Sequence, residues 1–355
     1  GGLKVLSQNL YLGIDLGTLL TATTAEEVQG AFQQLITTSA FDAANPAAGP
    51  RRLRDIAEMI LAESPHVAAL QEVTRYEFTF ADGSEAVLDF REVLQGWLDT
   101  YWLMGYTPYR YEWVVNPLVE APTLELPVMG GVAVDYHDAD ALLIRSDVAT
   151  VGAPVLGTFA AVQPFSVFGT VFEYWRGWQA VTIEFGGREI VVVNTHLEVQ
   201  QFEDVQLAQT AELIEWMDGR DAPVIALGDF NSAANHDAPE DQYSGSYPML
   251  RQAGYADLWL REAHSVGGVT CCQAGDLTNS ESQLTARLDL VLVKWGAAGF
   301  GGRSRMEVLG EEPSDRIEFT GVSPFLADPF PVTLWPSDHA GVVATMWPAP
   351  GRLRD

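Results

Sequence analysis

The sequence predicts an α/β protein in which packed β-sheets are covered by helices within one domain over residues 1–355. Many short apolar runs of strand length outnumber the segments with helical periodicity. Polar residues lie at the ends of five of these apolar runs, four of them after the run and one just before it. No internal repeat and no long linker divides the chain, and 355 residues are enough to bury a large core.

Four segments have the sequence features of helices. A capping-box pattern over 24–27 begins the first helix. Apolar residues at helical spacing predict the second helix, which ends before Pro65. The Ala-, Pro- and Gly-rich stretch 40–50 predicts a loop between these two helices. The expected helices cover residues 24–36, 51–63, 85–104 and 203–218.

The other apolar runs predict strands, because runs of about four to eight apolar residues between turn formers are typical of buried strands. Gly186 and Gly187 separate two such runs, and this spacing predicts a β-hairpin. The expected strands cover residues 3–8, 67–70, 109–116, 130–135, 140–145, 148–155, 178–184, 188–195, 224–229, 287–294 and 340–343.

Three segments are expected to be insertions into this pattern: residues 76–130, 158–176 and 296–336. The second is rich in aromatic residues and predicts either a hairpin or a loop. The third is rich in Gly, Pro and Phe and precedes the last strand.

The formal net charge of -28 is the strongest feature of the composition. Repulsion on this scale favours solubility and weakens attraction for polyanions such as DNA. A local basic groove is still compatible with this charge, and a solvated face is the alternative interpretation of the same residues. The candidate arginines are Arg51, Arg52, Arg54, Arg303 and Arg305.

Sequence features also bear on the compartment. No stretch approaches the roughly 18 apolar residues of a membrane helix. Residues 1–4 lack a signal peptide and lead directly into a strand, so any signal is expected to have been removed already. Cys271 and Cys272 are adjacent, so they cannot join distant parts of the chain. They are either two thiols or a vicinal disulfide, and they lack the CxxC spacing of a zinc site.

The five polar clusters predict one composite site at an edge of the sheets. They contain Asn9, Glu72, His196, the pair Asp229 and Asn231, and the pair Asp338 and His339. Each cluster alone has a structural explanation, since asparagine and aspartate also cap turns. Five clusters at five strand ends favour a functional explanation.

These residue types suit metal-assisted hydrolysis of a phosphoester. Glu72 and Asp338, with Asn9 as a neutral oxygen ligand, predict a Mg²⁺ site, with Mn²⁺ and Ca²⁺ as alternatives. Two further roles require a base for water and hydrogen-bond donors for phosphoryl oxygens. The candidates for the base are Asp229 and His339, the candidate donors are His196 and Asn231, and Asp289 is expected to orient the His339 ring.

At these residues the chain resembles the endonuclease/exonuclease/phosphatase superfamily, whose DNase I-like and sphingomyelinase-like members are phosphoesterases. The resemblance covers residues 3–346. It implies a four-layer α/β/β/α sandwich of two mostly antiparallel sheets flanked by helices. It also implies a carboxylate behind His196, for which Asp140 or Asp138 is the candidate. The matching motifs are Gln8-Asn9, Gln71-Glu72, 194–197, 228–231, 287–289 and Ser337-Asp338-His339.

Two further comparisons within the superfamily refine this expectation. Residues 7–13 and 270–273 resemble secreted bacterial members, which favours a secreted protein. Abasic-site nucleases carry an acidic residue at the position of Tyr11, so this subfamily is disfavoured.

Three functions follow as hypotheses. The first is a secreted, monomeric phosphodiesterase for a small or lipid-derived substrate, supported by the acidic charge and by aromatic residues at 158–178 and 295–300 that could contact an apolar group. Core packing is the alternative explanation of these aromatic residues. The second is a nonspecific nuclease, and the third is a catalytically silent binding module.

Overall fold

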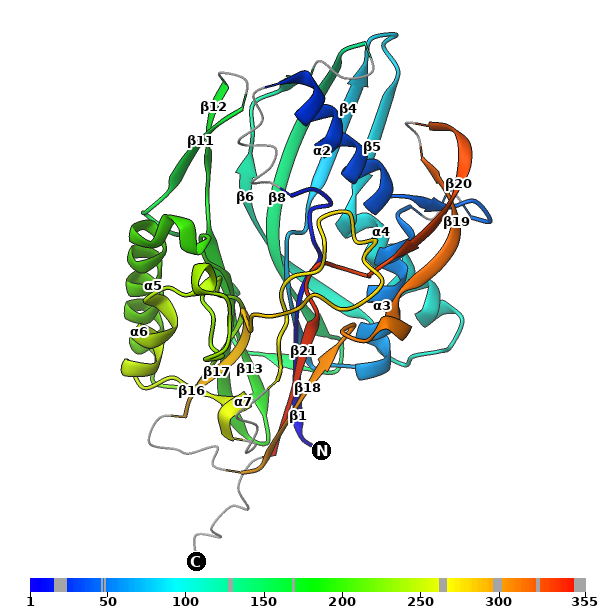
Figure 1. Cartoon of the computed structure of the whole chain (residues 1–355). Coiled ribbons are helices and arrows are strands. Elements are labelled where there is room, and N and C mark those ends of the chain that lie inside the picture. Colours follow the sequence, from blue (N-terminus) through cyan, green and yellow to red (C-terminus); the bar gives the residue numbers. More distant parts are fainter. Residues whose placement is uncertain are drawn as a thin grey trace, which may run out of the picture.

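The computed structural model describes residues 1–15, 24–45, 47, 49–126, 130–167, 170–261, 267–295, 302–323 and 326–347. It confirms a mixed α/β fold in which two large sheets are flanked by helices (Figure 1). The helices are α2 (Ala25–Thr38), α3 (Arg51–Glu63), α4 (Phe90–Leu103), α5 (Glu203–Asp218), α6 (Ser246–Gln252) and α7 (Leu258–Arg261). Among the described residues, no helix is both long and apolar enough to cross a membrane.

The larger sheet runs in the order β18 (Ser304–Leu309), β21 (Gly341–Met346), β1 (Leu3–Asn9), β3 (Val67–Gln71), β8 (Val132–Arg145), β4 (Arg75–Phe80) and β5 (Glu85–Asp89). Two more strands, β6 (Tyr111–Glu120) and β7 (Leu124–Leu126), pair with β8. Strands β1 and β3 are parallel, and the other described pairings of this sheet are antiparallel.

The second sheet runs in the order β10 (Val155–Thr158), β13 (Gly177–Phe185), β14 (Arg188–His196), β15 (Val224–Asp229), β17 (Asp289–Lys294) and β16 (Ala256–Asp257). A short strand, β9 (Ala149–Thr150), also pairs with β13. Here β14 and β15 form the parallel pair. The expected hairpin through Gly186 and Gly187 is confirmed, because β13 and β14 pair from Phe185 and Arg188 to Gly177 and His196.

Smaller elements surround these sheets. The aromatic segment forms a hairpin of β11 (Gln163–Val167) and β12 (Thr170–Tyr174). A separate sheet contains β2 (Phe41–Asp42), β19 (Ile317–Ser323) and β20 (Leu326–Leu334). Three 3₁₀ turns, η2 (Gln200–Phe202), η3 (Glu240–Gln242) and η4 (Pro313–Asp315), complete the described elements.

Alternation along the strands decides which surface each residue buries. In β1, Leu3 and Val5 join an apolar cluster that contains Ile225 and Leu227 of the second sheet. Leu6 of the same strand joins a different cluster, which it shares with Leu53 of α3. Helices α5 and α6 lie against the second sheet (Figure 1), and residues of both helices and of this sheet form a further apolar cluster.

The first helix begins as the sequence predicts. The Thr24 side chain accepts a hydrogen bond from the Glu27 backbone N–H, and the Glu27 side chain accepts one from the Thr24 backbone. This reciprocal cap satisfies two backbone donors that the first helical turn would otherwise leave unpaired.

The expected helix over 85–104 is wrong in its first turn. Residues Glu85–Asp89 form β5, which pairs with β4, and the helix starts only at Phe90. Asp89 is the reason for this boundary, because its extended backbone ends the strand and its side chain accepts a hydrogen bond from the Glu92 N–H.

Two other strand boundaries differ from expectation. The strands expected at 130–135 and 140–145 are one continuous strand, β8. Strand β6 pairs along most of one edge of β8, and β4 and β3 pair with successive halves of the other edge. The strand expected at 148–155 is instead two short strands, β9 and β10, which contact different parts of β13.

Candidate active site

The two parallel strand pairs bring the predicted polar residues to one edge. Because parallel strands point the same way, their carboxyl ends lie side by side. Asn9 pairs with Gln71 in the larger sheet, and His196 pairs with Asp229 in the second sheet. Asp229 in turn lies opposite Asp289, which brings a second carboxylate to the same edge.

Asn194 connects the two sheets at this edge. Its Nδ2 donates to the backbone oxygens of Leu70 and Ala141, each at 3.0 Å. Its Oδ1 accepts a hydrogen bond of 2.7 Å from Gln71 Nε2. These buried hydrogen bonds fix the position of one sheet relative to the other. They therefore also fix the distance between the two halves of the site.

Gly228 permits the close approach of β14 and β15 beside the site. Its backbone φ of 143° is rarely adopted by residues other than glycine. A Cβ atom at this position would lie 1.9 Å from the Thr195 backbone oxygen. Glu72 and Asn231 also have positive φ values, of 56° and 47°. Such conformations cost free energy in residues other than glycine and occur often at functional sites.

His339 is held by a buried carboxylate. Asp289 Oδ2 lies 2.7 Å from His339 Nδ1. Burial alone would lower the pKa of His339, but the negative charges of Asp289, Asp229 and Asp338 outweigh it and raise this pKa well above its usual value. These charges therefore favour the positively charged imidazolium form of His339.

His196 is in the opposite state. Arg176 Nη1 lies 2.8 Å from His196 Nδ1, whereas Asp140 Oδ1 is 4.0 Å from the same atom, too far for a hydrogen bond. Burial and the positive charges of Arg176 and His339 lower the pKa of His196 well below its usual value. His196 is thus a neutral imidazole, and the expected partner Asp140 lies behind it without a hydrogen bond to it.

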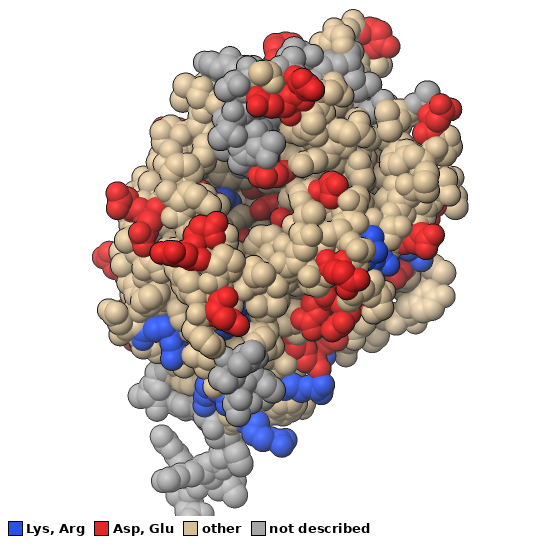
Figure 2. Space-filling model, in the orientation of Figure 1, with Lys and Arg blue, Asp and Glu red and all other residues tan. Residues whose placement is uncertain are grey.

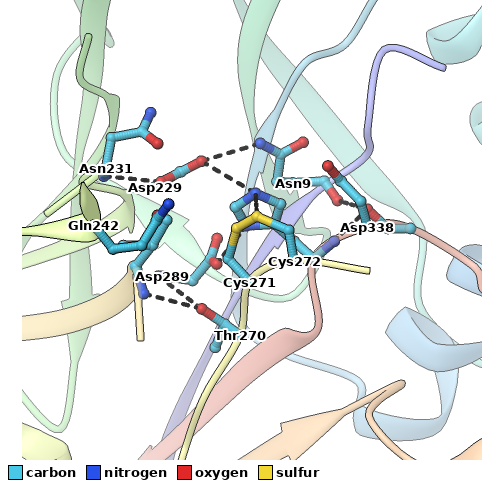
Figure 3. Close-up of a disulfide and its surroundings, with 12 residues drawn as sticks. Asn9, Asp229, Asn231, Gln242, Thr270, Cys271, Cys272, Asp289 and Asp338 are labelled. Atoms are coloured by element: carbon cyan, nitrogen blue, oxygen red, sulfur yellow. Dashed lines mark hydrogen bonds and ion pairs between the residues drawn. A yellow bond between two sulfur atoms is a disulfide. The ribbon is translucent and has the colours of Figure 1, made fainter. Parts of the chain in front are cut away.

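Asp229 lies between the two imidazoles. Its Oδ2 is 3.4 Å from His196 Nε2 and 3.7 Å from His339 Nε2. Asn9 Nδ2 donates to the same oxygen at 3.2 Å, while the Asn231 backbone N–H donates to Oδ1 at 3.0 Å (Figure 3). The Asn231 side chain lines the cleft and donates to the Leu197 oxygen at 3.0 Å, and its role as a donor to the substrate stays a prediction.

Glu72 and Asp338 form the candidate cation site. Burial and then the negative charge of Asp338 raise the pKa of Glu72 to about 7, and burial raises that of Asp338 to about 6. Two half-buried carboxylates whose charged forms are disfavoured fit a hard divalent cation, which prefers oxygen ligands. Asn9 Nδ2 donates a hydrogen bond of 3.0 Å to Glu72 Oε1, and Asn9 Oδ1 accepts a hydrogen bond from the Tyr11 backbone N–H. Asn9 would have to turn its amide to become an oxygen ligand.

An adjacent set of groups also has metal-ligating chemistry. Single ligand atoms of Asp229, Asp289 and His339 lie within 4.8 Å of one another. The 2.7 Å contact between Asp289 and His339 already accounts for two of them as a hydrogen-bonded pair. Glu72 and Asp338 therefore stay the predicted cation ligands.

Short hydrogen bonds tie the His339 loop to the end of β1. The Ser337 hydroxyl donates to the Asn9 oxygen at 2.7 Å, and Gln8 Nε2 donates to the His339 oxygen at 3.2 Å. Arg52, which is fully buried, donates to the backbone oxygens of Leu10, Tyr11 and Pro336. One arginine thereby fixes the loops on both sides of the candidate cation site.

A disulfide joins Cys271 and Cys272 at the wall of the site (Figure 3). Cys271 pairs through its backbone with Ala286 on one side and His339 on the other. Cys272 is exposed, and its Sγ lies 3.9 Å from His339 Nε2. The cysteine segment is thus positioned against the catalytic candidates, a proximity that the sequence alone did not indicate.

These groups open into a cleft of about 900 Å³, which appears as a hollow in the face shown in Figure 2. One wall is the hairpin β11–β12, whose Phe165 packs edge-to-face against Phe202 with ring centroids 5.5 Å apart. Asp and Glu side chains surround the hollow, while Lys and Arg on this face gather toward its lower edge (Figure 2).

The arginines considered for a basic groove have other contacts. Arg51 and Arg54 form ion pairs with Asp55 and Glu58 of their own helix, and Arg305 pairs with Glu307. Arg303 stacks over Trp347, and Arg52 is buried as described above. None of these five lines the cleft. Of the aromatic segments, residues 296–300 and Phe168 lie outside the described residues.

Arg176 is the cleft residue that sequence reasoning missed. It precedes Gly177, which pairs with His196 across the hairpin. A two-residue turn at Gly186 and Gly187 fixes this register, so counting outward from the turn places Arg176 beside His196. The register of the hairpin was therefore the available signal.

Comparisons with known proteins agree with this fold. A model of the endonuclease/exonuclease/phosphatase family matches residues 7–339. No curated protein matches the sequence. Truncated TDP2 from Caenorhabditis elegans is 17% identical, with a TM-score of 0.51 and 97% of each chain covered.

Two other solved structures are similar over the same extent. A family protein from Leptotrichia buccalis is 16% identical, with a TM-score of 0.54 and coverage of 97% of this chain and 99% of that one. D. rerio TDP2 in complex with a single-strand DNA product is 13% identical, with a TM-score of 0.53 and coverage of 97% and 98%. At these identities the likeness shows the fold alone.

The family match extends from Ser7, in the first strand that leads to the site, to His339, the last imidazole of the site. The chain therefore belongs to the endonuclease/exonuclease/phosphatase family.

Proposed function

We propose that the chain hydrolyses a small or lipid-derived phosphodiester in a reaction that depends on a divalent cation. Members of its family are metal-dependent phosphoesterases, so phosphoric ester hydrolysis is its general activity. One observation carries the proposal. Asp229 lies within 4 Å of a neutral and a positively charged imidazole, beside a pair of carboxylates suited to a cation.

Each side chain has a role that follows from its charge and contacts. Glu72 and Asp338 would hold Mg²⁺, which neutralises charge on a phosphoryl oxygen when bound. Asp229, oriented by the Asn231 N–H, accepts a proton from the attacking water. His196 offers an uncharged N–H donor, and the imidazolium of His339 stabilises the negative charge that develops on phosphorus-bound oxygens.

Asp289 supports this chemistry without touching the substrate. It holds His339 through Nδ1, so that Nε2 faces the cleft and Asp229. A buried carboxylate behind an imidazole fixes the ring orientation and stabilises its charged form.

The cleft supports a compact substrate with an uncharged group. Arg176 is the single Lys or Arg among the described cleft residues, and it is buried against His196. A polyanion gains its affinity from many phosphate contacts with Lys and Arg, which this cleft does not offer. An apolar cavity of about 50 Å³ beneath α2 shares Leu12 and Ile14 with the cleft and could take part of an apolar group.

A nuclease is the second candidate. The solved structure of D. rerio TDP2 holds a single-strand DNA product on a similar fold, and a cleft of about 900 Å³ has room for a nucleotide. The catalytically silent alternative is disfavoured, because the titratable groups that hydrolysis requires all lie together.

Turnover of bis(p-nitrophenyl) phosphate with and without EDTA tests the activity. We expect hydrolysis that EDTA abolishes and added Mg²⁺ restores, and the absence of metal-dependent turnover would exclude the proposal. Parallel assays on a plasmid, sphingomyelin and a glycerophosphodiester then separate the two candidates. Faster cleavage of the plasmid than of every small or lipid diester would favour the nuclease.

We further propose that the protein acts as a monomer outside the cell. The disulfide between Cys271 and Cys272 supports an oxidising compartment, where such bonds persist. Light scattering of the purified protein and detection of the mature chain in culture medium test these two points.

A further inference from the structure

Arg176 lies at the buried end of the cleft among several acceptors. Its Nη1 is 2.8 Å from His196 Nδ1, and its Nη2 is 3.8 Å from Glu198 Oε1. The guanidinium also lies over the Tyr174 ring, 4.6 Å from the centroid. Only 6% of Arg176 is exposed, so its position is fixed by packing and by these contacts.

The chemistry of the guanidinium determines the state of the imidazole beside it. A guanidinium carries five N–H donors and no acceptor, and it stays protonated in proteins. A hydrogen bond between Arg176 and His196 Nδ1 therefore requires that Nδ1 accept it. An imidazole with an accepting Nδ1 is neutral and carries its proton on Nε2, the atom that faces Asp229 Oδ2 at 3.4 Å.

We propose that Arg176 is a positioning residue that fixes His196 as a neutral imidazole with its proton on Nε2. The proposal rests on the proposed function, in which that N–H meets a substrate oxygen. It reverses the expectation from the family resemblance, which placed a carboxylate behind this histidine. A carboxylate would accept a hydrogen bond from Nδ1–H and favour the charged ring, whereas an arginine excludes a proton from Nδ1.

The consequence is an asymmetric pair of imidazoles. His339, with Asp289 behind it, supplies a positive charge, and His196, with Arg176 behind it, supplies an uncharged donor. With His196 neutral, Asp229 faces a single imidazolium and not two. This arrangement keeps Asp229 able to accept a proton from water.

The competing explanation is that Arg176 only balances buried acids. Asp138, Asp140 and Glu198 all contribute to its electrostatic environment. The contacts argue against this as the whole role. The short hydrogen bond goes to His196, Glu198 is 3.8 Å away, and Asp140 Oδ2 has no hydrogen bond among the described residues.

The decisive measurement is made on the unmodified protein. Long-range ¹H–¹⁵N NMR of protein labelled at histidine nitrogens distinguishes protonated from accepting ring nitrogens. The His196 signals are assigned by their loss in His196→Gln. We expect an unprotonated Nδ1 and a protonated Nε2 near neutral pH, in the metal-free protein and with Mg²⁺. A proton on Nδ1 would overturn the proposal, even if no Arg176 variant folds.

Variants then connect this state to turnover. Arg176→Met removes the donor, and we expect His196 to lose its single tautomer and kcat to fall roughly 10–100-fold with a much smaller change in KM. Arg176→Lys keeps a donor without an acceptor and should restore the tautomer and part of kcat. If Arg176→Met lowers kcat while the His196 signals stay unchanged, Arg176 only balances charge and the proposal fails.

Arg220→Met is the matched control. Arg220 stacks on Trp216 beyond the end of α5, with 4.6 Å between the guanidinium and the ring centroid, and it is exposed. We expect unchanged His196 signals and unchanged kcat. The measured activity and the measured tautomer of His196 test the two proposals separately. A wild-type protein with the expected tautomer and no phosphodiesterase activity refutes the proposed function alone, and an active one with a proton on Nδ1 refutes the role of Arg176 alone.

Discussion

At the scale of single residues, opposite surroundings give two chemically identical side chains different tasks. His339 faces three carboxylates, and His196 faces an arginine, so one imidazole is charged and the other neutral. The sequence indicated that His196 ends a strand and that His339 precedes one, each near acidic residues. It did not indicate which partner each ring nitrogen meets, because Arg176 reaches His196 only through the register of a hairpin.

Removing the His339 imidazole should strongly slow the reaction. We expect His339→Ala to lower kcat at least roughly 100-fold, because it removes a positive charge from the transition state. Asp289→Asn should lower kcat at least roughly tenfold through the same ring. The two losses should not add in the double variant, since both act on one group. His236→Ala, at an exposed histidine, is the control, and near-normal turnover of His339→Ala would refute the role.

Cys272 offers a chemical test of the same geometry. After reduction, iodoacetamide should modify Cys272, which is exposed, in preference to Cys271, which is buried. The added group would lie close to His339 Nε2, now 3.9 Å from Cys272 Sγ, so we expect kcat/KM to fall at least roughly tenfold. Reduced, unmodified protein and a treated Cys272→Ser variant separate alkylation from reduction. Full activity of the alkylated protein would place Cys272 away from the reacting groups.

At the scale of elements, the parallel strand pairs explain why the site could be predicted. Asn9, Glu72, His196 and Asp229 follow apolar runs, and the ends of neighbouring strands meet at a sheet edge. The boundary at Asp89 and the continuity of β8 could not be predicted in the same way. Both depend on partners distant in sequence, which local periodicity does not contain.

Gly228 should be the least replaceable glycine of these elements. In Gly228→Ala, the Cβ atom would overlap the Thr195 oxygen, so β14 and β15 must separate beside Asp229. We expect a loss of about 3 kcal/mol in the free energy of unfolding and a large loss of activity. Gly83→Ala is the matched control, because Gly83 also has a positive φ but no neighbour within 4 Å. Urea denaturation measures the free energy of unfolding of both variants. Equal losses in the two variants would show that the close approach of Gly228 to Thr195 is unimportant.

At the scale of the whole molecule, the excess of negative charge extends into the site, where it favours the binding of a cation. The net charge of -28 was visible in the sequence, but its concentration at Glu72 and Asp338 required the fold. The partial burial of these two carboxylates is a tertiary effect. No pattern along the chain reports how close they lie to each other or to water.

Stability should therefore depend jointly on pH and Mg²⁺. Folding raises the pKa of Glu72 from 4.5 to about 7, because the folded protein holds the protonated carboxyl group more tightly than the unfolded chain does. The contribution of Glu72 to the free energy of unfolding is therefore complete below about pH 4.5 and is lost as pH rises through 7. Asp338 behaves alike, with a folded pKa of about 6. We expect the Tm of metal-free protein to fall over this range, and Mg²⁺ to raise Tm more at high pH than at low pH.

The matching variant isolates Glu72 from other titrating groups. Glu72→Gln cannot ionise at this position, so its metal-free Tm should fall less with rising pH, and Mg²⁺ should stabilise it less. Glu85→Gln, at an exposed residue of β5, should behave like the wild type. Identical Mg²⁺ titrations of Glu72→Gln and wild type would exclude Glu72 as a ligand.

The position of β21 has a consequence for how the protein is made. This strand lies between β18 and β1, and the loop before it carries Asp338 and His339. Its partner β1 is synthesised more than 300 residues earlier, so the pairing of Leu3 with Met346 can form only after β21 has left the ribosome. Until then one edge of β1 has no partner, and the loop that carries Asp338 and His339 lacks the strand that follows it.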